Sequence, residues 1–207
     1  AFLPNPPSPG RGGSLRAGAI LDRAVSGGRI TPAEALVLFE EAPLLELGAA
    51  AAAVRRRIHP GDRATYQVDR NINYTNVCVY RCTFCAFYRK AGDEDAYVLP
   101  LEEIGAKVDE TLALGGTGVL LQGGVHAELP FSFYEELLSF LRDRYPRIHR
   151  HAFSAPEIFF LAKKEKLPVA EVLARLRDAG LMSVPGGGAE VLEDGVRKRL
   201  SALAKAP

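Results

Sequence analysis

The sequence predicts an α/β fold that corresponds to the first half of a (βα)8 TIM barrel, preceded by an N-terminal helical segment. From residue 64 onward, short strand-like segments alternate with segments of helical periodicity, and this alternation is typical of parallel βα units with right-handed crossovers. Hydrophobic residues make up 47% of the chain, enough for a substantial core. A complete barrel needs about 250 residues. Because the chain has 207, we expect only about the first four βα units and interpret the chain as a fragment.

Three segments of the chain differ in composition. Residues 1–18 are rich in Pro, Gly and Ser, which predicts a flexible tail. Residues 19–60 form the predicted helical segment, in which Thr31, Pro32 and Glu34 have the spacing of a capping box at a helix start. A second helix is expected at 44–57. Residues 61–207 form the predicted barrel part.

The barrel part is expected to contain four strands. They are predicted at 64–74, 119–121, 148–153 and 181–184, and the helices at 101–112, 133–141, 158–164, 169–179 and 191–203. In barrels of this type the active site lies at the carboxyl ends of the strands. We therefore expect the segments after the four strands to converge on one site.

All three cysteines of the chain follow the first predicted strand, at Cys78, Cys82 and Cys85. Three thiolates in one short loop can hold three irons of a 4Fe–4S cluster, which leaves the fourth iron open to a substrate or cofactor. Zinc is an alternative, but a structural zinc site needs a fourth ligand from His126, His149 or His151. A disulfide would leave one cysteine over, and no secretory signal is recognisable. The pattern favours the cluster over zinc or unligated thiols.

The predicted second and third strands are followed by candidate ligand-binding segments. Gly123 and Gly124 follow the second strand, and their backbones could closely approach a ligand or merely form a turn. Ser154 follows the third strand, three residues before Glu157. This spacing is that of a capping box, so Ser154 could cap a helix, face a ligand pocket, or do both.

The last predicted strand is followed by three glycines and then by Glu190. Such a run permits close backbone approach to a bulky ligand, and Glu190 could bind a ribose or amino group or favour a helix N-terminus. The histidines are possible acid–base groups. His151, near a strand end, is the best candidate, although each histidine could have a purely structural role.

Composition excludes several classes of partner. The net charge of +1 gives no general attraction to nucleic acid. No apolar stretch reaches membrane-spanning length, so no membrane partner is expected. The free cysteines and the absence of a recognisable leader predict a cytoplasmic location.

The cysteine spacing resembles the Cys-x3-Cys-x-aromatic-Cys signature of the radical S-adenosylmethionine (SAM) enzymes, with Phe84 in the aromatic position. The chain is also similar to the menaquinone and deazaflavin branch of that family, and within it to the dehypoxanthine futalosine cyclases. This similarity rests on the segments Asp69–Arg89, Gln122–Gly124, His151–Glu157 and Pro185–Glu190.

The resemblance implies an enzyme with the family's (βα)8 barrel, a 4Fe–4S cluster and SAM. It assigns Cys78, Cys82 and Cys85 to the cluster, while places near or after the ends of the predicted strands make His151 and Glu190 the candidates for catalysis. The residues that it implies for SAM binding are Phe84, Gly123, Gly124, Ser154 and Glu190. A reducing electron donor such as flavodoxin or ferredoxin is implied as a partner.

The implied reaction belongs to the futalosine route of menaquinone biosynthesis. A 5′-deoxyadenosyl radical takes hydrogen from the ribose C4′ of dehypoxanthine futalosine, and the carbon radical then closes a spiro ring on the benzoate. We expect a half barrel to enclose this radical chemistry poorly, which leaves open that the chain alone is inactive. The alternatives are an aminofutalosine synthase, an F0 synthase subunit, and a non-enzymatic iron–sulfur or zinc-binding module.

Overall fold

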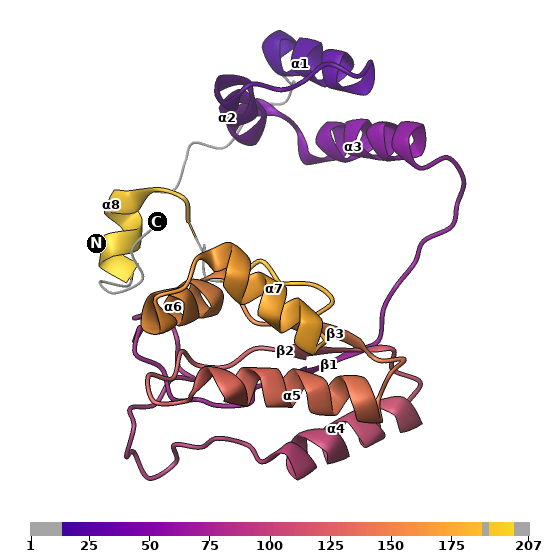
Figure 1. Ribbon diagram of the computed structural model, residues 1–207. Helices are drawn as coiled ribbons and strands as arrows, with labels where there is room; N and C mark the ends of the chain where they lie inside the picture. Colours follow the sequence, from indigo (N-terminus) through magenta and orange to yellow (C-terminus); the bar gives the residue numbers. More distant parts are fainter. Residues whose placement is uncertain (1–13, 188–190, 201–207) are drawn as a thin grey trace. The chain divides into compact units, whose positions relative to one another are not determined.

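The computed structural model describes residues 14–187 and 191–200 (Figure 1). The chain divides into two compact units, residues 1–65 and 66–207. The division falls five residues beyond the boundary expected after residue 60. Each unit is described by itself.

In its described residues, 14–65, the first unit contains the helices α1 (Leu15–Val25), α2 (Pro32–Glu41) and α3 (Leu44–Ile58). Its small core lies between α1 and α2 and contains Ala17, Ile20, Leu21, Val37 and Leu38. The capping box predicted at Thr31 and Glu34 is confirmed, with the Thr31 backbone amide donating to Glu34 Oε2 at 2.9 Å.

The helix α1 begins inside the segment for which a flexible tail was predicted. The hydroxyl of Ser14 accepts a hydrogen bond from the Arg16 amide at 3.2 Å and caps the helix. The apolar residues that follow are buried against α2, and this packing outweighs the weak local signal. The tail prediction for 1–18 is therefore wrong from Ser14 onward, and its other residues lie outside the described part.

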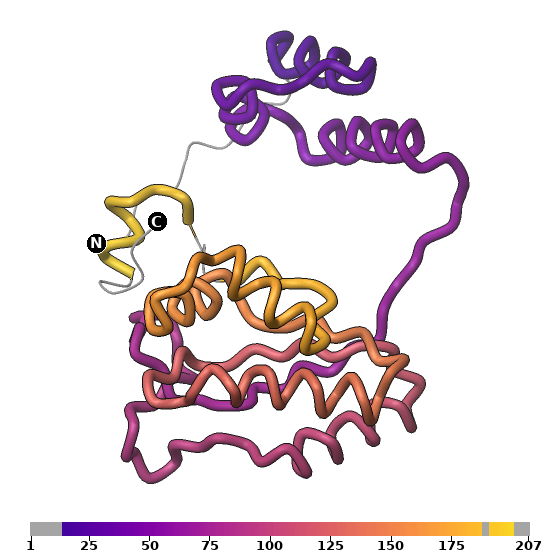
Figure 2. Tube along the Cα trace, viewed as in Figure 1, coloured from indigo at the N-terminus to yellow at the C-terminus, as the bar shows by residue number. Residues whose placement is uncertain are grey.

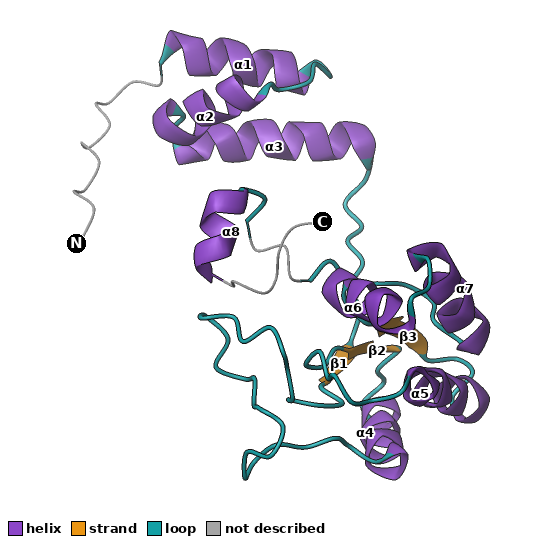
Figure 3. Ribbon diagram, turned by 60° about the vertical axis from the view of Figure 1, so that its left-hand side comes forward, coloured by secondary structure: helices purple, strands orange, loops and turns teal. Residues whose placement is uncertain are grey.

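Among its described residues, the second unit is built on a parallel sheet of three strands in the order β1 (Asp69–Ile72), β2 (Gly118–Leu121) and β3 (His149–Ala152). Its helices are α4 (Leu101–Ala113), α5 (Phe131–Arg144), α6 (Ala155–Glu165), α7 (Val169–Ala179) and α8 (Asp194–Leu200). Figure 3 shows α4, α5 and α7 along one side of the sheet, with loops on another side. The predicted α/β class with parallel βα units is confirmed.

The strand register assigns the two faces of the sheet different roles. Ile72, Leu121 and Ala152 are neighbours across the sheet and are buried in the main core. Leu137, Leu138 and Leu141 of α5 are fully buried in the same core. Successive side chains of a strand point to opposite faces. Asn71, Leu120 and His151, one position earlier in each strand, therefore share the opposite face.

The fourth predicted strand, 181–184, is reduced to a single parallel bridge between His151 and Ser183. The Ala152 amide donates to Ser183 O at 2.9 Å, and the Met182 amide donates to Arg150 O at 3.1 Å. Pro185 follows directly, and proline has no N–H with which to continue a ladder. In the described residues, the segment 181–184 therefore pairs with β3 at a single bridge and forms no longer strand.

A long connection runs from the end of β1 to the start of α4 and carries all three cysteines (Figure 2). It contains no helix in the described residues.

The first predicted strand, 64–74, is shortened to Asp69–Ile72, because a strand ends where its backbone pairing with a neighbouring strand ends. Only these four residues find partners on β2.

The Thr31–Glu34 box makes the stability of the helical unit depend on pH. The Arg23 side chain, followed by the amide and hydroxyl of Thr31, lowers the pKa of Glu34 from 4.5 to about 2. Ionised Glu34 therefore stabilises the fold above about pH 4.5, and this stabilisation is lost as the pH falls through about 2. We expect Glu34→Gln to lower the unfolding midpoint near neutral pH and to match the wild type near pH 2, measured by circular dichroism.

A matched control is Glu46→Gln, an exposed glutamate in the first turn of α3, where no side chain caps the helix. It should change the midpoint little at either pH. An equal effect of Glu34→Gln at both pH values would contradict the assignment.

Candidate functional site

The base of the cysteine loop is closed by backbone pairing on both sides. The Cys78 amide donates to Arg89 O at 3.0 Å, and the Arg89 amide donates to Asn76 O at 2.8 Å. The Arg89 guanidinium donates to the Asp95 carboxylate at 2.6 Å and to Tyr88 O at 2.9 Å. The Asn76 side chain accepts from the Tyr97 amide at 2.8 Å. Residues 78–88 are thereby held as one loop at the carboxyl end of β1.

The three cysteines are half-buried free thiols within this loop. The Cys85 amide donates to Cys82 O at 3.0 Å, and Arg81 adopts the left-handed conformation with φ of 48°. The described residues contain no group of three His, Cys, Asp or Glu side chains placed to hold a metal ion. The structure thus places the predicted ligands on one loop without bringing their sulfurs together. Phe84, between the last two, is 53% exposed.

The donor chemistry of the loop fits an iron–sulfur cluster better than zinc. A structural zinc site needs four ligands. His126 accepts a hydrogen bond from the Glu128 amide at 3.1 Å, while His149 and His151 both contact Ser183. No described histidine joins the cysteines. Three thiolates on one loop are the donor set for three irons of a 4Fe–4S cluster.

Gly123 and Gly124, after β2, pack against the segment that leads into the cysteines. A Cβ at Gly123 would lie 2.6 Å from the Tyr74 ring, and one at Gly124 would lie 2.2 Å from Val77 O. The Gly124 amide donates to Thr75 O at 2.8 Å. The sequence left open whether these glycines approach a ligand or form a turn. The structure shows that Gly123 approaches the Tyr74 ring and Gly124 the Val77 backbone. Glycine-rich spacing alone could not distinguish the two.

Ser154, after β3, begins α6 as the predicted capping box, which is confirmed. Its amide and its hydroxyl donate to Glu157 Oε2 at 2.6 and 2.5 Å. Phe153, which precedes it, has φ of 57°. This left-handed conformation is strained for a bulky residue, and the Phe153 ring is buried edge-on against Tyr74 and Tyr134.

Glu157 is almost fully buried and was not expected to contact other loops. Its Oε1 accepts from the Tyr74 hydroxyl at 2.6 Å and from the Gly123 amide at 3.3 Å. Burial raises the pKa of this carboxyl, and the surrounding donors oppose that rise. Burial and the nearby carboxylate also raise the pKa of Tyr74. Sequence reasoning identified only the local cap, because Tyr74 lies 83 residues away.

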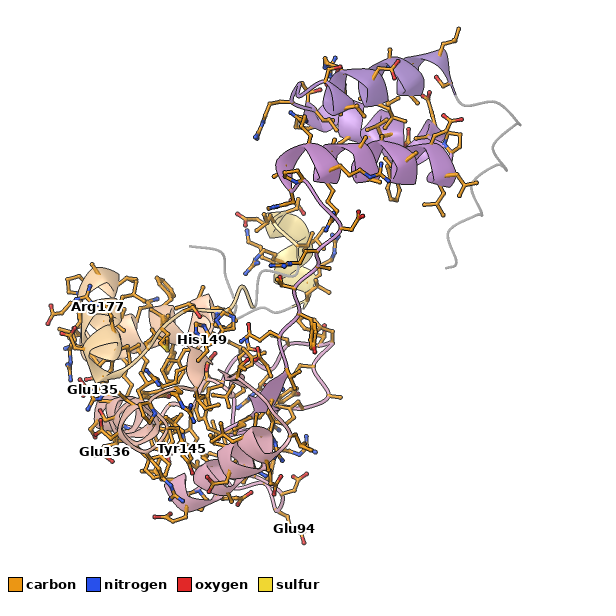
Figure 4. All side chains as sticks on the ribbon, turned by 90° about the vertical axis from the view of Figure 1, so that its right-hand side faces the viewer. Glu94, Glu135, Glu136, Tyr145, His149 and Arg177 are labelled. Carbon is orange, nitrogen blue, oxygen red and sulfur yellow. The ribbon has the colours of Figure 1, made fainter. Side chains whose placement is uncertain are left out.

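His149 and His151 occupy alternate positions of β3 and both contact one serine. His149 Nε2 lies 2.7 Å and His151 Nδ1 lies 2.6 Å from Ser183 Oγ. A hydroxyl has a single proton, so at least one imidazole must donate its own N–H to the serine oxygen. Figure 4 labels His149. The arrangement fixes the ring orientation of His151, the sequence candidate for acid–base chemistry.

The turn after Ser183 approaches the other loops at Gly187, where a Cβ would lie 2.7 Å from Gln122 Nε2 and 3.3 Å from Ser154 Cβ. The Val79 amide donates to Val125 O at 3.0 Å. The expected convergence of the segments after the strands is therefore confirmed for the described residues. Glu190, predicted for SAM binding and catalysis, lies outside them.

Comparison with known proteins assigns the family. The sequence model of the radical SAM superfamily matches residues 72–203. The chain therefore belongs to the radical SAM superfamily, whose cofactors are a 4Fe–4S cluster and SAM.

Two similar relatives carry the name cyclic dehypoxanthine futalosine synthase. The one from Halalkalibacterium halodurans is 43% identical over 89% of this chain and 50% of its own length. The one from Streptomyces coelicolor is 46% identical over 89% of this chain and 47% of its own length. A 5-amino-6-(D-ribitylamino)uracil–L-tyrosine 4-hydroxyphenyl transferase from Trichormus variabilis is 40% identical, with coverages of 87% and 48%. The chain thus spans about half the length of these relatives.

Solved structures agree with the fold. The maturase HydG of FeFe-hydrogenase aligns with a TM-score of 0.55 at 17% identity, over 82% of this chain and 45% of its own. Methylornithine synthase (PylB) aligns with a TM-score of 0.51 at 18% identity, with coverages of 80% and 57%. No helix among the described residues is long and apolar enough to cross a membrane.

The packing of Gly124 predicts a measurable effect of a single methyl group. In Gly124→Ala the new Cβ would collide with the Val77 backbone, and such overpacking costs about 1–3 kcal/mol. We expect a lower unfolding midpoint and less iron bound after anaerobic reconstitution, measured by calorimetry and iron analysis.

Gly186→Ala is the control, because a Cβ at Gly186 meets no atom of the described residues within 4 Å. It should leave both measurements unchanged. Equal iron content and stability in Gly124→Ala and the wild type would contradict the packing argument.

Proposed function

We propose that this chain is the cluster-binding half of a radical SAM cyclase that converts dehypoxanthine futalosine to its cyclic form in menaquinone biosynthesis. The observation that carries the proposal is the 43% and 46% identity, over 89% of the chain, to two enzymes named for that product. The convergence of the loops after β1, β2 and β3 supports it, because barrel enzymes place their sites there.

Each candidate residue has a role in this proposal. Cys78, Cys82 and Cys85 hold the cluster as thiolates. The cluster and SAM, when bound, supply a 5′-deoxyadenosyl radical that abstracts hydrogen from the substrate. Phe84, Ser154 and Glu190 contact SAM. The amides of Gly123 and Gly124 donate within the protein, so this turn contacts SAM through its carbonyl oxygens.

Restoring the aromatic ring after cyclisation requires the loss of one proton and one electron. His151 accepts the proton, with Glu190 assisting, and the electron would return to the oxidised cluster that the three cysteines would hold. Ser183 contacts Nδ1 of His151. The other ring nitrogen, Nε2, is therefore the one that would accept the proton. The electron needed to start the reaction comes from a small reducing protein such as flavodoxin or ferredoxin. The free thiols fit a reducing cytoplasm.

A second candidate is the transferase reaction named for the Trichormus relative. Its 40% identity over 87% of the chain is close to that of the cyclases. The cyclase and the transferase act on different substrates, so the substrate that the protein converts distinguishes the two functions.

The test is an anaerobic assay of the reconstituted protein with SAM, dithionite and dehypoxanthine futalosine, followed by mass spectrometry. Cyclised product together with 5′-deoxyadenosine is the expected result. Product from 5-amino-6-(D-ribitylamino)uracil and tyrosine, with none from dehypoxanthine futalosine, would contradict the cyclase assignment.

The role of His151 predicts a separation of two activities. In His151→Gln, cyclised product should fall by about 10²-fold or more, because a positioned base contributes at least that factor. Formation of 5′-deoxyadenosine should continue. His59→Gln, an exposed histidine of the helical unit, is the control. Full cyclisation by His151→Gln would exclude His151 as the base.

A further inference from the structure

We propose that Glu157 is a positioning residue that couples the cysteine loop to the Gly123–Gly124 turn and thereby sets the affinity for SAM. The proposal deepens the proposed function, since it rests on the assignment of SAM to these loops. Glu157 itself is 3% exposed. It acts through Tyr74 and the Gly123 amide.

The two oxygens of the Glu157 carboxylate serve different parts of the fold. Oε2 accepts the two hydrogen bonds from Ser154 and completes the cap of α6. Oε1 is not needed for the cap. It accepts instead from Tyr74, which lies after β1, and from Gly123, which lies after β2. One side chain therefore joins the segments that follow all three strands.

Comparison with the capping box at Thr31 and Glu34 shows what is unusual about the surroundings of Glu157. At Thr31, the Glu34 Oε2 accepts both hydrogen bonds from the cap residue and pairs with Arg23 of the preceding helix. That box is at the surface and stabilises only the helical unit. Glu157 has the same cap, but it is buried and has two additional donors from distant loops. A helix start alone does not require these donors.

The contacts continue from Glu157 to the cysteines. The Tyr74 ring lies against Gly123 closely enough to exclude a Cβ there. The next residue, Thr75, accepts from the Gly124 amide at 2.8 Å, and the Val79 amide donates to Val125 O at 3.0 Å. Cys78 lies between Thr75 and Val79 in the chain. A shift of the Tyr74 hydroxyl would therefore change the spacing between the first cysteine and the glycine turn.

Burial makes this coupling sensitive to small chemical changes. A buried acceptor that loses a donor bears an uncompensated desolvation cost. Tyr74→Phe removes one donor and keeps the ring that packs on Gly123. Glu157→Gln keeps the shape but replaces one acceptor oxygen by an NH2 group, which must face a donor. Both changes should loosen the glycine turn while the surrounding core remains intact.

The test compares Tyr74→Phe and Glu157→Gln with the wild type, and uses Glu34→Gln as the matched control in the other capping box. Hydrogen exchange of the metal-free protein reports on the amides of residues 122–126. The dissociation constant for SAM is measured on the reconstituted protein, together with its iron content and unfolding midpoint.

For Tyr74→Phe we expect amide exchange at residues 122–126 to be about tenfold faster and the dissociation constant for SAM to rise about tenfold. Iron content should stay at the wild-type value, which a general loss of structure would not allow. Glu157→Gln should move both readouts in the same direction, and Glu34→Gln should move neither.

Wild-type exchange and wild-type SAM affinity in Tyr74→Phe would overturn the proposal, as would equal changes in Glu34→Gln. A wild-type protein that binds no SAM would refute the proposed function instead. The exchange data would then still decide whether Glu157 holds the turn, because they need neither cluster nor SAM.

Discussion

Parallel pairing of β1, β2 and β3 brings the segments that follow the three strands to the same edge of the sheet. The register aligns Ile72, Leu121 and Ala152, so the segments that follow the three strands leave the sheet at the same level. The cysteine loop, the glycine turn and the start of α6 are separated by long stretches of sequence. They meet only because the strands run in one direction. A shift of one residue would reverse the faces of a strand and bury the wrong side chains.

One face of this sheet packs against the helices and stabilises the fold, and the other face carries the side chains that are candidates for chemistry. The face toward the helices is apolar and fully packed, with α5 supplying Leu137, Leu138 and Leu141. The exceptions are Arg70, which donates to Lys107 O at 3.1 Å, and the buried Arg150. The Arg150 guanidinium donates to Gly180 O at 2.7 Å and to Ile148 O at 2.9 Å, so its charge is solvated by backbone carbonyls. The other face carries polar side chains, including both strand histidines. Substitutions on this face can change function while leaving the core intact.

Glycine has two separate uses near the cysteines. Gly123 and Gly124 are required because the protein's own Tyr74 and Val77 occupy the space of a side chain. Gly186 has open space around it, so its freedom from a side chain serves no packing need within the described residues. A similar motif thus has a packing reason at one place and open space within the described residues at another. Only atomic neighbours distinguish the two cases.

Local features of this protein were determined by the sequence alone. The cysteine spacing, the alternation of strands and helices and both capping boxes depend on residues within a few positions of one another. Their chemistry is therefore visible in the order of residues. The strand 181–184 and residues 15–18, which belong to α1, were predicted less well, since partners elsewhere in the fold decided them.

Tertiary structure decided how these features act together. The contacts of Glu157 with Tyr74, of Gly124 with Val77 and of Ser183 with two histidines join residues that lie about 30 to 80 positions apart. Such contacts depend on strand register and on burial, which raises the cost of an unpaired polar group. The spacing of residues along the sequence does not reveal these contacts. The sequence determined which chemical groups are present, and the packed sheet determined which of them touch.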